Sequence, residues 1–223
     1  MQKMTEAMWV DELEQLAVDT TAAMLAAGGW VPPPTAHFLC AELSRLPYVG
    51  YLRTRPFYRG EDAHRAIAGL GWMASIAQAS RLVLVWEQAD LSIALERPSP
   101  LPSGLVVVDV PRDGEHEVRW HPMDVVETGS TPDGLPTAVP EWGPRRRVPG
   151  GRLPEPVVDL VALWREERTW THVRELADLY LTMVEDGYEP GWLGRPEPDH
   201  ELPLWRRVVA ELPGTVFEIQ ESA

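Results

Sequence analysis

Two neighbouring runs of residues around an Asp-Gly pair constrain the fold of this 223-residue chain more than any other feature. Residues 105–110 are almost all apolar, and residues 115–121 alternate between polar and apolar side chains, as strands do. A three-residue loop at 112–114, with its glycine left-handed, places Val108 opposite Val118 and gathers the apolar side chains on one face. A two-residue loop would set apolar against polar side chains. The sequence therefore predicts an antiparallel hairpin with the longer loop.

This register also sets Asp109 opposite Glu117, with their Cβ atoms about 5 Å apart. Two carboxylates at such a distance can share a proton or hold a divalent cation, and His121 follows on the second strand. These three residues are the candidate catalytic group. The sequence favours a structural interpretation, in which Arg119 and Arg112 screen the two charges on a solvated strand face.

Helical spacing of apolar residues predicts helices over 5–27, 36–46 and 61–79, and Gly28-Gly29 and Pro47 supply stop signals for the first two. Residues 81–86 form a short β-branched apolar run that is typical of a central strand. Residues 89–96 fit a strand or a short helix equally well, because so few residues show no clear period.

The 30 residues from 127 to 156 contain 7 prolines and 5 glycines, which predicts a structureless connection or an extended arm. Three further helices are predicted beyond it, at 156–168, 171–186 and 203–212. We expect an α+β domain over 1–126, with helices packed on a small, mainly antiparallel sheet of three or four strands. A helical C-terminal segment, 157–223, follows and can pack on the first part as one domain.

The net charge of the chain limits the kinds of molecule that it is expected to bind. The net charge of −14 disfavours broad nucleic-acid binding, which requires many Lys and Arg side chains to neutralise phosphates. Residues 155–223 hold 15 acidic and 6 basic residues, so we expect a basic protein partner for the C-terminal helices. Lys3 is the sole lysine, which excludes a lysine-dependent nuclease or kinase site. The bias to arginine is typical of GC-rich coding sequences and predicts a bacterial source.

The location and the cofactor requirement are also bounded by the sequence. The N-terminus mixes acidic with apolar residues, unlike a secretory signal, and the longest apolar stretches, such as 82–86, are too short to span a membrane. Cys40 is the only cysteine, as suits a reducing compartment. We therefore expect a cytoplasmic protein. Phosphate-loop, dinucleotide, nucleophile-elbow and zinc-protease motifs are all missing from the sequence, so we predict neither a cofactor nor a metal.

Arginines among aromatic residues form a second candidate site. Arg53, Arg55 and Arg59 lie in a predicted loop at 51–59, where guanidinium groups and aromatic rings suit an anionic ligand. In the alternative interpretation, which the net charge favours, these arginines neutralise acidic helices of the same fold.

Two tryptophans and three glutamates are the candidate contacts with a protein partner. Trp142 and Trp192 lie in Pro/Gly-rich surroundings, where tryptophan anchors an interface or folds back over the core. Glu166, Glu175 and Glu185 belong to the acidic C-terminal helices.

Two functional hypotheses follow. The leading one is a non-enzymatic acidic protein, such as an inhibitor, an immunity protein or an accessory factor, that binds a basic protein. The alternative is a hydrolase or transferase in which the carboxylate pair and the arginine loop converge in one pocket. Nucleic-acid binding confined to the arginine-rich loops is a third and less favoured hypothesis, and the sequence gives no oligomeric state.

Overall fold

The computed structural model describes residues 5–41, 47–98, 101–166, 172–194 and 214–217, which form five helices and nine strands. In chain order the elements are α1 (Glu6–Ala26), β1 (Thr35–Leu39), β2 (Tyr48–Arg53), α2 (Glu61–Ile76), β3 (Arg81–Glu87), α3 (Gln88–Ala94), β4 (Gly104–Pro111), β5 (Glu117–Ser130), β6 (Pro136–Trp142), β7 (Arg146–Pro149), α4 (Glu155–Arg165), α5 (Val173–Glu185), β8 (Glu189–Leu193) and β9 (Thr215–Phe217). Eight strands lie side by side in the order β6-β5-β4-β3-β1-β2-β8-β9, and β7 also pairs with β5. The described strand pairs are antiparallel except the parallel pair β8–β9.

The expected sheet of three or four strands is therefore wrong, because the chain builds one large sheet. Helices and mainly antiparallel strands do combine, as in an α+β fold. One cause of the error is β1, which lies in the segment predicted to be a helix over 36–46. Its five residues are all buried between β2 and β3, and a strand buried on both faces has no alternating pattern that separates it from a buried helix.

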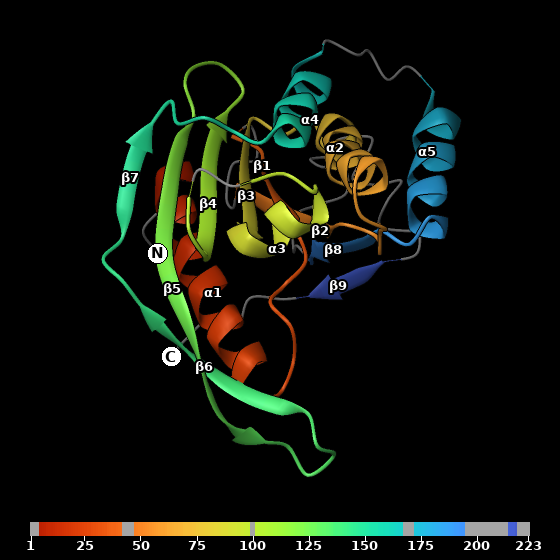
Figure 1. Cartoon of the computed structure of the whole chain (residues 1–223). Helices are drawn as coiled ribbons and strands as arrows, with labels where there is room; N and C mark the ends of the chain where they lie inside the picture. The colour runs from red at the N-terminus through yellow and green to blue at the C-terminus, as the bar shows by residue number, and fades with distance from the viewer. Residues whose placement is uncertain (1–4, 42–46, 99–100, 167–171, 195–213, 218–223) are drawn as a thin grey trace.

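The sheet has a helical layer on each face (Figure 1). On one face α2, α4 and α5 cover a core that includes Phe38, Leu84 and Val108. On the other face α1 lies across β3 and β4, where Leu13 and Val107 belong to a second core cluster. The strands between the two layers have both faces buried, so these strands have near-continuous apolar sequences.

Close packing of α4 on α2 depends on one glycine. A Cβ added to Gly71 would lie 2.5 Å from the carbonyl oxygen of Leu160. The absence of a side chain at Gly71 thus admits the neighbouring helix α4.

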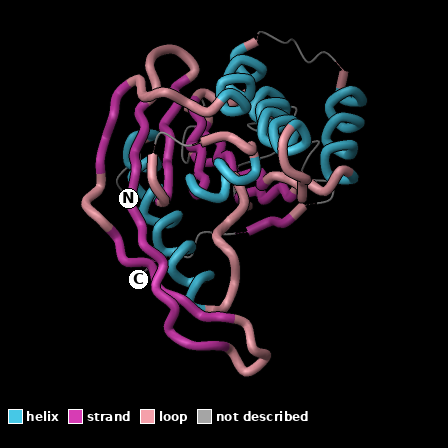
Figure 2. The backbone as a smooth tube through the Cα atoms, in the orientation of Figure 1, coloured by secondary structure: helices cyan, strands magenta, loops and turns pink. Residues whose placement is uncertain are grey.

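A two-stranded arm, formed by the end of β5 with β6, projects from the body of the molecule (Figures 1 and 2). Its base packs on the end of α1 through Leu25, Met123 and Ala138. Pro136 and Pro140 both lie on β6, the strand at the end of the sheet order, and proline has no N–H that a further strand could pair with. The arm therefore discourages edge-to-edge pairing.

The remaining sequence expectations have mixed outcomes. The segment 127–156 is not structureless, because it contains the end of β5 together with β6 and β7. The undecided segment 89–96 forms most of α3, a helix. The helices expected at 156–168 and 171–186 correspond to α4 and α5, whereas the one expected at 203–212 lies outside the described residues.

Candidate functional site

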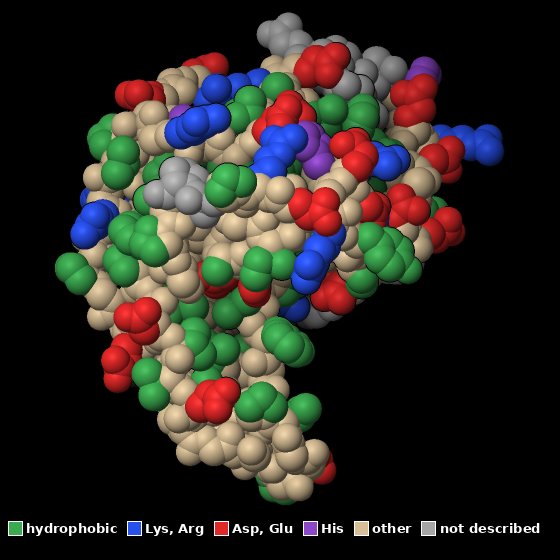
Figure 3. Space-filling model, in the orientation of Figure 1, with side chains coloured by type: hydrophobic (Ala, Val, Ile, Leu, Met, Phe, Trp, Pro, Cys, Tyr) green, Lys and Arg blue, Asp and Glu red, His purple; other side chains and the backbone are tan. Residues whose placement is uncertain are grey.

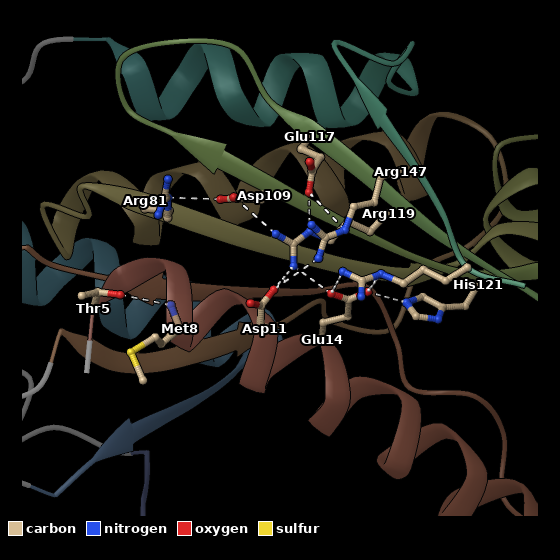
Figure 4. Close-up of polar contacts among 11 residues, drawn as sticks. Thr5, Met8, Asp11, Glu14, Arg81, Asp109, Glu117, Arg119, His121 and Arg147 are labelled. Atoms are coloured by element: carbon tan, nitrogen blue, oxygen red, sulfur yellow. Dashed lines mark hydrogen bonds and ion pairs between the residues drawn. The ribbon is translucent and has the colours of Figure 1, made fainter. Parts of the chain in front are cut away.

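The predicted hairpin register is confirmed, and Asp109 lies opposite Glu117. Figure 4 shows both carboxylates directed at Arg119, whose Nε donates to Oε1 of Glu117 at 2.6 Å and whose Nη2 lies 4.0 Å from Oδ2 of Asp109. Arg81 adds a second cation, with Nε 3.1 Å from Oδ1 of Asp109. Arg112, the other expected screening residue, lies instead over a tryptophan ring of α4.

Glu14 of α1 is at the centre of a larger group of charges. Its side chain is only 5% exposed and accepts hydrogen bonds from Arg119, at 2.7 Å, and from Arg145, at 2.8 Å. His121 Nε2 lies 2.7 Å from the other carboxylate oxygen. Asp11, one turn earlier, also accepts from Arg119 at 2.7 Å. We call this group the ionic cluster; it comprises Asp11, Glu14, Arg81, Asp109, Glu117, Arg119, His121, Arg145 and Arg147.

The protonation of the cluster follows from burial and from these contacts. Burial alone would raise the pKa of Glu14, but the hydrogen bonds from His121 and Arg119 outweigh it and lower the pKa. Burial raises the pKa of Asp109, and Arg81 and Arg119 offset only part of that rise. Arg119 has a raised pKa although burial opposes it, because Glu14 and Glu117 bind its charged form. Glu14 is therefore deprotonated, and its carboxylate pairs with Arg119 and Arg145.

This arrangement ties elements of the fold together through ion pairs. The arginines connect α1 to β3, β5 and β7 from one side of the sheet. Two cavities in the described part of the chain are lined by other residues. Among the described residues, no group of three or more His, Cys, Asp or Glu side chains is arranged to hold a metal ion. The candidate catalytic residues Asp109, Glu117 and His121 therefore lie on one face but are engaged by neighbours within the fold.

The arginine-rich segment is neutralised in a similar way. Arg55 forms an ion pair with Asp62, and hydrogen bonds from Arg55 and from the Tyr58 amide lower the pKa of Asp62 to about 2. Arg53 lies over the Tyr51 ring and 3.7 Å from Glu189. Arg59 is exposed.

The arginine-rich segment and the hairpin do not converge. Arg53 ends β2, and both β1 and β3 lie between β2 and the hairpin strand β4. At the usual strand spacing, β2 and β4 are about 14 Å apart. A single pocket formed by both groups is therefore not supported by the described geometry.

The candidate contacts with a protein partner occupy different environments. Trp192 is 1% exposed and packs on Phe38 and Tyr180, so it belongs to the core. Trp142 is half-buried and meets His121 edge to face. Glu166, Glu175 and Glu185 are all exposed, at the end of α4 and at the two ends of α5.

Two buried polar features were missed by the sequence interpretation. Glu14 is one, although its place on the apolar stripe of α1, four residues after Val10, is a signal that could have found it. The other is His37, whose Nδ1 lies 3.0 Å from the Tyr48 hydroxyl. Burial and the nearby Arg53 lower the pKa of His37 to about 3, so this ring is neutral.

Comparison with protein-family models, curated proteins and solved structures found no match to this chain. In the described residues, none of the helices combines the length and the apolar character that crossing a membrane requires.

Proposed function

We propose that this chain is a non-enzymatic acidic protein that binds a basic protein partner through the surface of α5. The observation that carries the proposal is the set of carboxylates on α5 and just after it, formed by Glu175, Asp178, Glu185, Asp186 and Glu189. The side chains of Asp178 and Glu189 are 69% and 68% exposed. Figure 3 shows acidic side chains gathered over this side of the molecule.

Charge balance supports this surface as the contact. Within residues 172–194 the one basic residue besides His172 is Arg174, which lies 3.7 Å from Asp178. Exposed charges of one sign steer an oppositely charged partner and raise the association rate about 10-fold to 1,000-fold at low salt. A basic partner is therefore the class of protein that this surface favours.

The engagement of the other candidate residues adds support. A general base or a nucleophile must face a space that a substrate can enter. Asp109, Glu117 and His121 instead contact Arg119 and Glu14, and Arg55 contacts Asp62. The interaction hypothesis requires no such space. As part of the same proposal, the protein acts in the cytoplasm, a reducing compartment that suits a chain with one cysteine.

The first experiment is a pull-down from the lysate of the native host at low and high salt, with bound proteins identified by mass spectrometry. We expect a stoichiometric basic protein that is lost at high salt. The association rate of this partner is then measured for the variant with Glu166, Glu175 and Glu185 each changed to Lys. We expect a fall of about tenfold or more, because the steering charge is reversed.

The matched control carries the same change of charge elsewhere, with Glu12, Asp113 and Asp133 changed to Lys. These residues are exposed on α1 and on two hairpin turns. An equal fall in the association rate for both variants would mean that the rate depends only on the net charge of the protein. An unchanged rate for the variant with Glu166, Glu175 and Glu185 changed, or an empty pull-down, would contradict the proposal.

A further inference from the structure

A cavity of about 990 Å³ lies beside α3, on the sheet face that also carries α2 and α4. Its walls come from the end of β3 with α3 and the segment after it, from strands β4 and β5, and from the start of α4 with the residues before it; Figure 1 shows where these elements lie. Pockets for small molecules commonly enclose about 300–1,000 Å³. This cavity is therefore large enough for a small organic ligand.

The walls of the cavity are mostly apolar. Trp86, Val106 and Val118 line it from the sheet, and Leu91 and Leu153 line it from the flanking segments. These side chains belong to or pack against the main core, so their positions are set by packing as well as by the cavity. A ligand with an apolar body would cover this surface.

One buried amide lies among these apolar groups. Gln88 is 5% exposed; its Oε1 accepts from the Trp86 indole at 3.0 Å, and its Nε2 donates to Ser92 at 3.3 Å. An amide nitrogen carries two hydrogens, and only one of them has an acceptor among the described residues. The Gln88 amide is thus fixed by Trp86 and Ser92, and it adds one polar group to a mostly apolar wall.

The rim of the cavity carries cations. Arg97, after α3, forms an ion pair with Glu155 at the start of α4. Arg152 is exposed and also lines the cavity, and it makes no hydrogen bond or ion pair with another described residue. The rim residues thus include two arginines and one glutamate, which leaves a local positive charge on an acidic protein.

We propose that this cavity binds a small amphipathic carboxylate, with its hydrocarbon body over Trp86, Val106 and Val118 and its carboxylate on Arg152. Arginine suits this role because its planar donor pair matches a carboxylate. The binding site is separate from the acidic face of α5, so neither proposal depends on the other.

The probe for the test is 11-(dansylamino)undecanoate, whose fluorescence rises when it leaves water for an apolar site. We expect saturable binding of one probe per chain. Decanoate should displace the probe about tenfold more effectively than decanol or decylamine, because hydrogen bonds to charged groups contribute about one tenfold step in affinity. Equal displacement by all three compounds would overturn the carboxylate assignment.

Two pairs of variants locate the bound probe. Val158→Trp narrows the cavity from its rim, and Val148→Trp is the matched control on β7, since the two valines are 49% and 48% exposed. Arg152→Gln removes the proposed carboxylate contact, and Arg174→Gln removes an exposed arginine of α5. We expect at least tenfold weaker probe binding for V158W and R152Q and no change for the two controls. An absence of saturable binding, or equal affinities for V158W and V148W, would overturn the proposal.

Discussion

Replacing Glu14 by Gln tests whether the ionic cluster holds α1 on the sheet. The change keeps the size of the side chain but removes the carboxylate that faces Arg119, Arg145 and His121. Removing one partner of a buried ion pair costs about 3–5 kcal/mol, because the other charge stays buried without compensation. Arg119 keeps Asp11 and Glu117 as partners, so we expect the lower end of this range, about 3 kcal/mol.

The assay is chemical unfolding followed by tryptophan fluorescence, together with thermal unfolding. For a chain of this size a loss of about 3 kcal/mol lowers Tm by about 6–12 °C. The matched control is Glu12→Gln, which makes the same change at an exposed position of α1. A loss below about 1 kcal/mol, or equal losses for both variants, would refute the role of the cluster.

The dependence on pH gives an independent check of the same contact. The pKa of Glu14 is lowered in the folded chain, so its contribution to stability is present above the ordinary pKa of 4.5 and is lost as pH falls through the folded value. We therefore expect the difference in stability between wild type and E14Q to be constant at neutral pH and to shrink below pH 4.5. A difference that stays constant through acidification would show that the loss has another origin.

Three further predictions concern single positions. Asp109→Asn is expected to leave stability at pH 7 unchanged or higher, since burial raises the pKa of Asp109 and disfavours its charged form; a clear loss in urea unfolding would contradict this. The His37 ring, with a pKa of about 3, is expected to show no titration by NMR between pH 8 and pH 5, and a midpoint near 6.5 would mean that the ring is solvated. Gly71→Val is expected to destabilise the fold by about 1–3 kcal/mol in the same unfolding assay, because its Cβ would overlap the Leu160 carbonyl, and an unchanged midpoint would mean that α4 moves away freely.

Local sequence was sufficient where neighbouring residues determine the geometry. The pairing of Val108 with Val118 follows from the polar and apolar pattern and from a glycine at the end of the loop, and Gly114 has the expected positive φ of 119°. The placement of Asp109 opposite Glu117 followed from that register alone. The hairpin register and the placement of Asp109 opposite Glu117 were therefore predictable from residues 105–121.

Sequence patterns failed where a partner lies far along the chain. The contact between Glu14 and Arg119 joins residues 105 positions apart, and no periodic pattern of neighbouring residues predicts it. Strand β8 pairs with β2 across more than a hundred residues, and it places Trp192 in the core although its sequence resembles a loop. Burial of these side chains is a property of the assembled sheet.

The sequence by itself determined the hairpin register, the presence and approximate ends of α1, α2, α4 and α5, and the acidic character of the C-terminal helices. These properties depend on side-chain period, turn residues and charge, which are local. Only the tertiary structure decided the size of the sheet and the partners of the carboxylates. The physical reason is that a central strand is defined by neighbours on both sides, and a buried charge by the countercharge that folding brings to it.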